Sequence, residues 1–231
     1  MHRNCRARMP AAATERGAAR EARGRRLRDL YAVTPDLGDT ARLCASVASA
    51  LAGGASAVQY RNKSATAARR AEQASALAAL CRSRGALFIV NDDAQLALAV
   101  DADGVHLGED DAELRTARAI VGDDRLIGVS CYNDIERARA LAPDADYLAF
   151  GSLYASTVKP AARHAPLQLL AEARALRRMI VGIGGIDAGN AAEVIRAGAD
   201  AVAVINAVFA SDDVERAARR IAAACAQARE A

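Results

Sequence analysis

Short apolar runs alternate with longer Ala-rich stretches along the chain from residue 29 onward. Several runs are apolar at nearly every position, which is typical of strands covered on both faces of a parallel sheet. In the intervening stretches Leu, Ala, Val and Ile recur every three or four residues, which indicates helices. The runs span residues 29–34, 56–61, 86–91, 104–107, 126–130, 146–151, 179–184 and 201–206.

This repeat of a strand followed by a helix, at about 20 to 30 residues per unit, predicts an α/β fold of the (β/α)8 TIM-barrel type. The segment after 86–91 is short, so we expect an abbreviated helix there. A doubly wound open sheet is the alternative. The length of 231 residues suits one barrel domain, which we place at residues 29–231. Expected N-caps and C-terminal glycines of the helices are Asp39, Ser64, Asn133, Gly53, Gly85 and Gly198.

Residues 1–28 carry nine Arg against two Glu, whereas the remainder is mildly acidic. We predict a dispensable, disordered basic extension; an appended helix and a targeting or anion-binding segment are the alternatives. The acidic body argues against a nucleic-acid-binding domain, and no apolar run predicts a transmembrane helix or a secretion signal. The five Cys are scattered without a CxxC pair, which argues against disulfides or structural zinc and favours the cytoplasm.

Functional side chains of such a barrel belong at the carboxyl ends of its strands. Gly184 and Gly185, followed one strand later by Asn206, predict a phosphate site of backbone amides; tight turns with positive φ are the alternative. Asp187 stands where a dinucleotide fingerprint has its third glycine, which disfavours that motif. The remaining polar strand ends are Gln59, Arg61, Lys63, Asn91, Asp92, His106 to Asp111, Ser130 and Ser156 to Lys159.

Two carboxylates, Asp92 and Asp111, fall among the cations Arg61, Lys63 and Lys159 in this set. Carboxylates would repel an anion unless Mg²⁺ lies between them and a diphosphate, so we predict that arrangement. Salt bridges of Arg61 or Lys63 along the rim are the alternative. Both Lys of the chain, against 29 Arg, belong to this group, where a compact ammonium can sit against phosphate.

Other chemistry finds less support in the sequence. His106 lies within an apolar strand, and we expect a packed, hydrogen-bonded side chain there, with substrate contact as the alternative. No arrangement of Ser, His and Asp, and no pair of Cys and His, predicts covalent acyl transfer.

The chain resembles the thiamine-phosphate synthase family over about residues 29–210. The segments that carry the resemblance are QYRNK (59–63), IVND (89–92), ADGVHLGEDD (102–111), GVS (128–130), ADYLAFGSLYASTVKP (145–160), VGIGGID (181–187) and AVAVINAVF (201–209). The resemblance implies a transferase that joins 4-amino-5-hydroxymethyl-2-methylpyrimidine diphosphate to a thiazole phosphate and releases pyrophosphate, with one Mg²⁺. It implies small-molecule substrates and leaves a homo-oligomer open. From composition and cysteine usage we expect no membrane or nucleic-acid partner and a cytoplasmic location.

The resemblance also implies roles for individual residues. Those that would hold the pyrimidine diphosphate are Gln59, Tyr60, Arg61, Asn62, Lys63, Asn91, Ser130 and Lys159, with Lys63, Ser130 and Lys159 catalytic. Asp92 and Asp111 would bind the metal. Those that would hold the thiazole phosphate are Ser156, Thr157, Val158, Gly185, Ile205 and Asn206.

Departures from the family pattern concentrate in the thiazole-phosphate half. The residues that differ from the common pattern are Asn62, Glu109, Tyr132, Ser152, Ala155, Val158 and Asn206. A thiazole tautomerase-like paralogue would lack the diphosphate set and carry His in place of Ser130. The sequence also leaves open a sugar-phosphate isomerase or epimerase and a non-catalytic binder of thiamine precursors.

Overall fold

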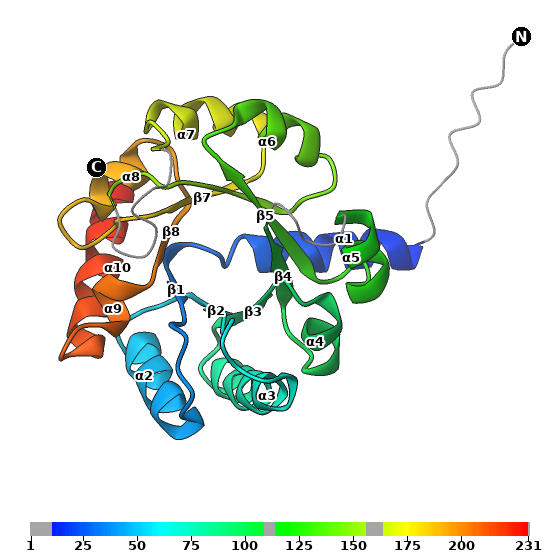
Figure 1. Cartoon of the computed structure of the whole chain (residues 1–231). Coiled ribbons are helices and arrows are strands. Elements are labelled where there is room, and N and C mark those ends of the chain that lie inside the picture. The colour runs from blue at the N-terminus through cyan, green and yellow to red at the C-terminus, as the bar shows by residue number, and fades with distance from the viewer. Residues whose placement is uncertain (1–10, 109–113, 156–163, 231) are drawn as a thin grey trace, which may run out of the picture.

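A closed barrel of eight parallel strands forms the centre of the molecule, with β8 pairing back to β1 (Figure 1). The computed structural model describes residues 11–108, 114–155 and 164–230. The strands are β1 (Asp29–Val33), β2 (Ala57–Tyr60), β3 (Leu87–Asn91), β4 (Gly104–Leu107), β5 (Leu126–Tyr132), β6 (Tyr147–Phe150), β7 (Met179–Ile183) and β8 (Ala201–Val204). Each overlaps a predicted run, so the predicted TIM barrel is confirmed and the open sheet is wrong.

Helices surround the barrel on its outer face, except α1, which lies across one end of it (Figure 1). They are α1 (Ala11–Gly24), α2 (Thr40–Ala52), α3 (Ala67–Ser83), α4 (Ala94–Ala99), α5 (Leu114–Val121), α6 (Ile135–Leu141), α7 (Gln168–Ala173), a 3₁₀ turn η1 (Arg174–Leu176), α8 (Ala191–Arg196), α9 (Asn206–Phe209) and α10 (Val214–Glu230). The helix between β3 and β4 is short, as expected. Within the described residues, no helix combines the length and apolar character that crossing a membrane requires.

The helix starts follow the predicted chemistry, with two shifts along the chain. The Asp39 carboxylate accepts from the backbone N–H of Arg42 and caps α2, as expected. Thr66, not Ser64, caps α3, because the Ser64 hydroxyl donates instead to the side chain of Asn62. Asp134, not Asn133, caps α6. A carboxylate or hydroxyl one or two residues away can satisfy the same orphan N–H groups, so composition alone does not fix the position.

Two apolar clusters hold the barrel together, one between strands and helices and one inside the barrel. The inner cluster includes Tyr31, Ile89 and Tyr147, which are almost fully buried. Gly128 gives the Tyr147 ring its space, because a Cβ at Gly128 would lie 1.8 Å from the ring's Cζ. A tyrosine therefore fits inside the barrel only because the neighbouring strand carries glycine.

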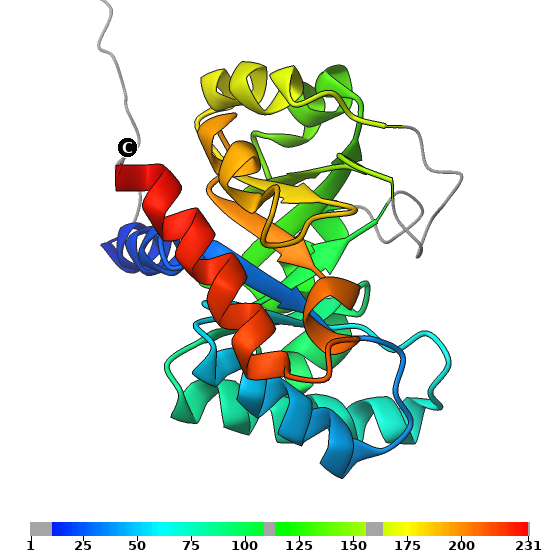
Figure 2. The ribbon, with the colours of Figure 1, turned by 90° about the vertical axis from the view of Figure 1, so that its left-hand side faces the viewer.

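Helix α1 lies across the amino-terminal end of the barrel, on the side opposite to the turn that follows β2 (Figure 2). Arg20 Nε lies 3.0 Å from Asp146 and Arg23 Nε lies 3.2 Å from Asp103, two carboxylates that precede strands. Leu27 is fully buried in the inner cluster. The expectation that residues 1–28 are disordered therefore differs from the structure over Ala11–Gly24, where the alternative of an appended helix matches.

Candidate active site

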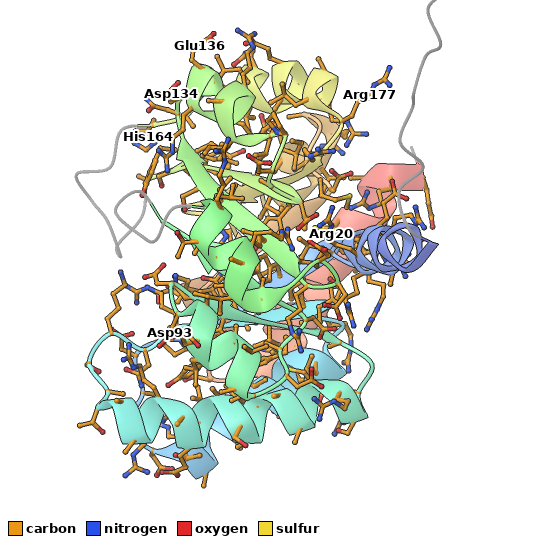
Figure 3. All side chains as sticks on the ribbon, turned by 90° about the vertical axis from the view of Figure 1, so that its right-hand side faces the viewer. Arg20, Asp93, Asp134, Glu136, His164 and Arg177 are labelled. Carbon is orange, nitrogen blue, oxygen red and sulfur yellow. The ribbon has the colours of Figure 1, made fainter. Side chains whose placement is uncertain are left out.

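Polar side chains gather at the carboxyl ends of the strands, the end of the barrel opposite to α1. In Figure 3, Asp93, which follows β3, and Asp134, which follows β5, lie on the side away from Arg20 of α1. This is the end at which barrels of this type place functional loops. The described residues predicted to take part in diphosphate and metal chemistry follow the strands at this same end.

The turn after β2 is fastened to the turn after β1. The buried Thr34 hydroxyl accepts from the backbone N–H of Arg61 at 2.8 Å and donates to the Arg61 carbonyl at 2.9 Å. Asp36 accepts from the Arg61 guanidinium and from the backbone N–H of Lys63, both at 3.1 Å. Thr34 and Asp36 were not predicted from the sequence, although both follow the first strand of the barrel, a position that would have identified them. Together they hold the two cations of this turn at the rim.

Lys63 meets the carboxylate that follows the neighbouring strand. Its Nζ lies 3.2 Å from Oδ2 of Asp92. Asp92 has a positive φ of 64° and donates its backbone N–H to the carbonyl of His106 at 2.8 Å, while the Asn91 amide donates to its Oδ1. This backbone conformation is uncommon for a residue other than glycine, and such strain concentrates at functional sites. The salt bridge that was the alternative to a metal site is thus present, and it joins two of the residues predicted to bind diphosphate and metal.

Gln59 and Ser130 lie inside the barrel mouth, as a contact with substrate requires. The Gln59 side chain is almost buried and donates from Nε2 to the Tyr31 hydroxyl at 2.8 Å. Ser130 Oγ lies 3.0 Å from Nε2 of His106, whose Nδ1 lies 3.0 Å from the Tyr147 hydroxyl. His106 is thus the packed, hydrogen-bonded histidine that we expected. Tyr31 and Tyr147 were missed, since strands that are apolar on both faces hide which positions face inward.

Tyr60 and Asn62 do not join this group, and their predicted contact with the pyrimidine diphosphate is not supported by the side-chain positions. Tyr60 belongs to the outer cluster, and its hydroxyl donates to Gln73 of α3 at 2.9 Å. Asn62 is buried and donates to the Leu37 carbonyl at 3.0 Å and to Gln73 at 3.1 Å. Successive side chains of a strand face opposite sides, so Gln59 inside the barrel directs Tyr60 outward. Asn62 instead organises the turn.

The ends of β6, β7 and β8 form the second half of the rim. Gly184 and Gly185 have positive φ values of 101° and 64°. A Cβ at Gly185 would lie 2.4 Å from the carbonyl oxygen of Ala155, so glycine is needed for the close approach of the turns after β6 and β7. Ile205 and Asn206 follow β8, the neighbour of β7. The tight-turn alternative thus accounts for the glycine pair, and both glycines are partly exposed.

Comparison with known proteins decides the family. The family model described as thiamine monophosphate synthase matches residues 30–208. The chain belongs to the thiamine monophosphate synthase family. It is 57% identical to the thiamine-phosphate synthase of Chromobacterium violaceum over 198 residues, covering 85% of this chain and 96% of that protein. It is 53% identical to that of Bordetella pertussis over 203 residues, covering 84% of this chain and 94% of that protein.

A solved structure supports the same assignment. Thiamine phosphate pyrophosphorylase from Pyrococcus furiosus superposes with a TM-score of 0.79 at 36% identity, covering 90% of this chain and 98% of that one. The names of these relatives, thiamine-phosphate synthase and thiamine phosphate pyrophosphorylase, agree with the family model. Membership of the thiamine monophosphate synthase family confirms the resemblance noted in the sequence.

Some predicted members of the family's site lie outside the described residues. They are Asp111, Ser156, Thr157, Val158 and Lys159, with the departure at Glu109. Within the described ranges, no three side chains of His, Cys, Asp or Glu group closely enough to hold a metal by themselves. The Asp92 carboxylate, with its side chain 26% exposed at the rim, offers a hard oxygen ligand. Mg²⁺ is commonly bound through one or two carboxylates plus substrate phosphates, so the donors present fit that ion.

Proposed function

We propose that this chain is a thiamine-phosphate synthase, which condenses 4-amino-5-hydroxymethyl-2-methylpyrimidine diphosphate with a thiazole phosphate. The C–O bond to diphosphate breaks and its electron pair leaves with pyrophosphate, while the lone pair of the thiazole nitrogen forms the new C–N bond. The observation that carries the proposal is the meeting of Arg61, Lys63 and Asp92 at the mouth of a barrel lined by Gln59 and Ser130. Family membership supports the same reaction.

The residues of this half neutralise and align the leaving group. Negative charge accumulates on the diphosphate as its bond to carbon breaks, and fixed cations lower the energy of that transition state. Arg61 and Lys63 are held for this by Asp36, which bonds to the guanidinium of one and the backbone of the other. Gln59 and Ser130 orient the pyrimidine, and Asn91 and Lys159 complete the set in this proposal. Alignment of the two substrates supplies the remaining acceleration, because no covalent nucleophile is needed.

We propose that Asp92 and Asp111 hold one Mg²⁺. When bound, the ion supplies further charge neutralisation of the diphosphate. Asp92 is suited to this role because Lys63 and Asn91 already fix its two carboxylate oxygens at the rim. For the thiazole phosphate we propose the backbone around Gly185 with Ile205 and Asn206. The segment Ser156, Thr157 and Val158 joins them in that proposal.

The cellular setting that we propose is the cytoplasm, and the partners that we propose are the two small-molecule substrates. The described Cys44, Cys81, Cys131 and Cys225 are free thiols, which suits a reducing compartment. The acidic body of the chain disfavours nucleic acid as a partner.

The test is formation of thiamine phosphate by the purified full-length protein from both precursors. We expect product and pyrophosphate in equal amounts, loss of both on chelation, and recovery on addition of Mg²⁺. A protein that binds the pyrimidine diphosphate without product would be the non-catalytic binder, and isomerisation of the thiazole phosphate alone would identify the tautomerase. Activity with excess chelator would contradict the magnesium proposal and leave the reaction intact.

A further inference from the structure

A row of hydrogen-bonded side chains crosses the interior of the barrel from Gln59 to Ser130. Gln59 Nε2 lies 2.8 Å from the Tyr31 hydroxyl, which lies 3.0 Å from the Tyr147 hydroxyl. The Tyr147 hydroxyl lies 3.0 Å from His106 Nδ1, and His106 Nε2 lies 3.0 Å from Ser130 Oγ. Five strands contribute one member each. The two ends of the row are residues that our proposed function places on the substrate.

The middle of the row is buried and its two phenols are neutral. Tyr31 and Tyr147 are each 1% exposed. Burial, the main cause in both cases, raises the pKa of the Tyr31 and Tyr147 hydroxyls well above the ordinary value for tyrosine. Each hydroxyl therefore keeps one hydrogen to donate at neutral pH. The His106 ring stacks on the Tyr147 ring, with centroids 5.5 Å apart. This stacking fixes the imidazole between the Tyr147 hydroxyl and Ser130 Oγ.

The direction of the hydrogen bonds follows from counting donors. The Gln59 amide nitrogen only donates, so the Tyr31 oxygen accepts from it. Among the described residues, the Tyr31 hydrogen has one acceptor in reach, the Tyr147 oxygen. If Tyr147 donated to Tyr31 instead, the Tyr31 hydrogen would lie unpaired in a buried position, which is costly. Tyr147 thus donates to Nδ1 of His106, and the His106 proton lies on Nε2 and points to Ser130.

We propose that Tyr31, Tyr147 and His106 are positioning residues that orient the two substrate-facing groups through this one-way row. The identity of the ligand in this inference comes from the proposed function. It assigns the outward group of Gln59 as its carbonyl oxygen, a hydrogen-bond acceptor. It assigns the outward group of Ser130 as its hydroxyl hydrogen, a donor, because the Ser130 oxygen already accepts from His106. The opposite row would require the Gln59 amide turned over and would present the opposite pattern to the ligand.

The first test reads the His106 tautomer directly. Nitrogen-15 NMR of the ligand-free, histidine-labelled protein at about pH 8, where imidazole is ordinarily neutral, distinguishes Nε2–H from Nδ1–H. The chain has only three His, which makes assignment by a His106→Gln variant direct. We expect one tautomer, protonated on Nε2, in the unaltered protein and in Tyr31→Phe, where His106 Nδ1 is the remaining acceptor for the Tyr147 hydrogen. We expect a mixture in Tyr147→Phe, which removes the phenol hydrogen that makes Nδ1 an acceptor. A proton on Nδ1 in the unaltered protein would overturn the proposal.

The second test asks whether the row acts on Ser130 during turnover. Tyr147→Phe, Ser130→Ala and the double variant are compared by kcat/KM for the pyrimidine diphosphate. Side chains in one hydrogen-bond network couple, so we expect the double variant to depart from the product of the single effects by about threefold or more. If the two single effects on kcat/KM multiply to give the double variant within about twofold, the row is not a positioning device. Changes that act only through lost packing at separate sites have free-energy effects that add in this way.

Tyr60→Phe is the matched control for Tyr31→Phe and Tyr147→Phe. It removes the hydroxyl of another buried tyrosine, one that donates to Gln73 on the outer face of β2. We expect a similar change in the unfolding temperature for all three variants, with kcat/KM lowered about threefold to tenfold only in Tyr31→Phe and Tyr147→Phe. An equal loss in Tyr60→Phe would assign the effect to stability and overturn the proposal. The NMR test needs no turnover, so absence of activity would count against the proposed function alone.

Discussion

The ammonium group of Lys63 lies 3.2 Å from Oδ2 of Asp92 and joins the turn after β2 to the end of β3. The Lys63 side chain is 61% exposed, and ion pairs at such positions stabilise a fold by only about 0 to 1 kcal/mol. Stability therefore does not explain why a cation and a strained carboxylate are held together here. The joint binding that we propose, of a phosphate by the cation and of Mg²⁺ by the carboxylate, would explain it.

Replacement of Asp92 by Ala should abolish turnover and spare the fold. We expect kcat/KM to fall by about 100-fold or more, because Asp92 is one of the two carboxylates that we propose as Mg²⁺ ligands. The unfolding temperature should change by no more than about 2 °C, since the exposed ion pair adds little stability. Steady-state kinetics and thermal melts measure both. The control is Asp144→Ala, which removes an exposed carboxylate that precedes β6 at the other end of the barrel. This variant should leave both kcat/KM and the unfolding temperature unchanged. Unchanged kinetics in Asp92→Ala would remove Asp92 from the mechanism.

Exchange of Lys63 for Arg should impair catalysis although the charge is kept. A guanidinium is larger and planar, whereas the compact ammonium of Lys63 sits beside one Asp92 oxygen. We expect kcat/KM to fall about tenfold, measured with both substrates and Mg²⁺. The reverse exchange Arg84→Lys, on an exposed residue between α3 and β3, should leave activity unchanged. Full activity in Lys63→Arg would mean that only the charge at this position matters.

The strand pattern sufficed to predict the barrel, because runs that are apolar on both faces report burial between a core and surrounding helices. The same property concealed the inward positions, so Tyr31 and Tyr147 were missed. The resemblance over QYRNK assigned Tyr60 to substrate together with Gln59, while strand alternation sends Gln59 and Tyr60 to opposite faces.

Contacts between residues distant in sequence were the other feature that could not be predicted. Asp36 gains its role only when the turn after β1 meets the turn after β2. The Arg- and Ala-rich composition before residue 29 fits both a disordered arm and a helix. What distinguishes them is the presence of Asp103 and Asp146 at the amino-terminal end of the barrel, about 80 to 125 positions further along the chain.

Replacement of Gly128 by Ala should disturb the site and the core together. The added methyl group would overlap the Tyr147 ring, which cannot move without breaking its hydrogen bonds to Tyr31 and His106. Overpacking of this kind costs about 1 to 3 kcal/mol or more. We expect a lower free energy of unfolding in urea and a higher KM for the pyrimidine diphosphate. Gly38→Ala, where a Cβ meets nothing within 4 Å, is the control. Equal stability of the two variants would contradict the packing argument.

Alkaline pH should unfold the protein partly through its buried thiols. Burial, the main cause, raises the pKa of Cys81, Cys131 and Cys225 to about 12, from 9.0 in an exposed thiol. The folded state thus disfavours the thiolate, so this stability is complete below about pH 9 and is lost as pH rises from 9 toward 12. Each thiol should add about 1.4 kcal/mol per pH unit to the decline above about pH 10. In Cys225→Ala, the free energy of unfolding measured in urea should decline with pH less steeply by that amount. Cys44 is only half-buried, so Cys44→Ala should change the slope less. Identical pH slopes in all proteins would contradict the assignment.

Removal of α1 should destabilise the barrel without silencing the site. Deletion of residues 1–28 takes away Arg20 and Arg23, which pair with Asp146 and Asp103, and the fully buried Leu27. Loss of a buried Leu side chain alone costs about 2 to 5 kcal/mol, because it opens the inner cluster. Since α1 lies at the end of the barrel away from the rim, kcat/KM of the folded fraction should stay within about twofold of the full chain (Figure 2). Urea unfolding and kinetics at low temperature measure the two effects, with deletion of residues 1–10 as the control that keeps the helix. Equal unfolding midpoints for the two truncated proteins would show that α1 does not stabilise the barrel. A large loss of kcat/KM would show that α1 contributes to the function of the site.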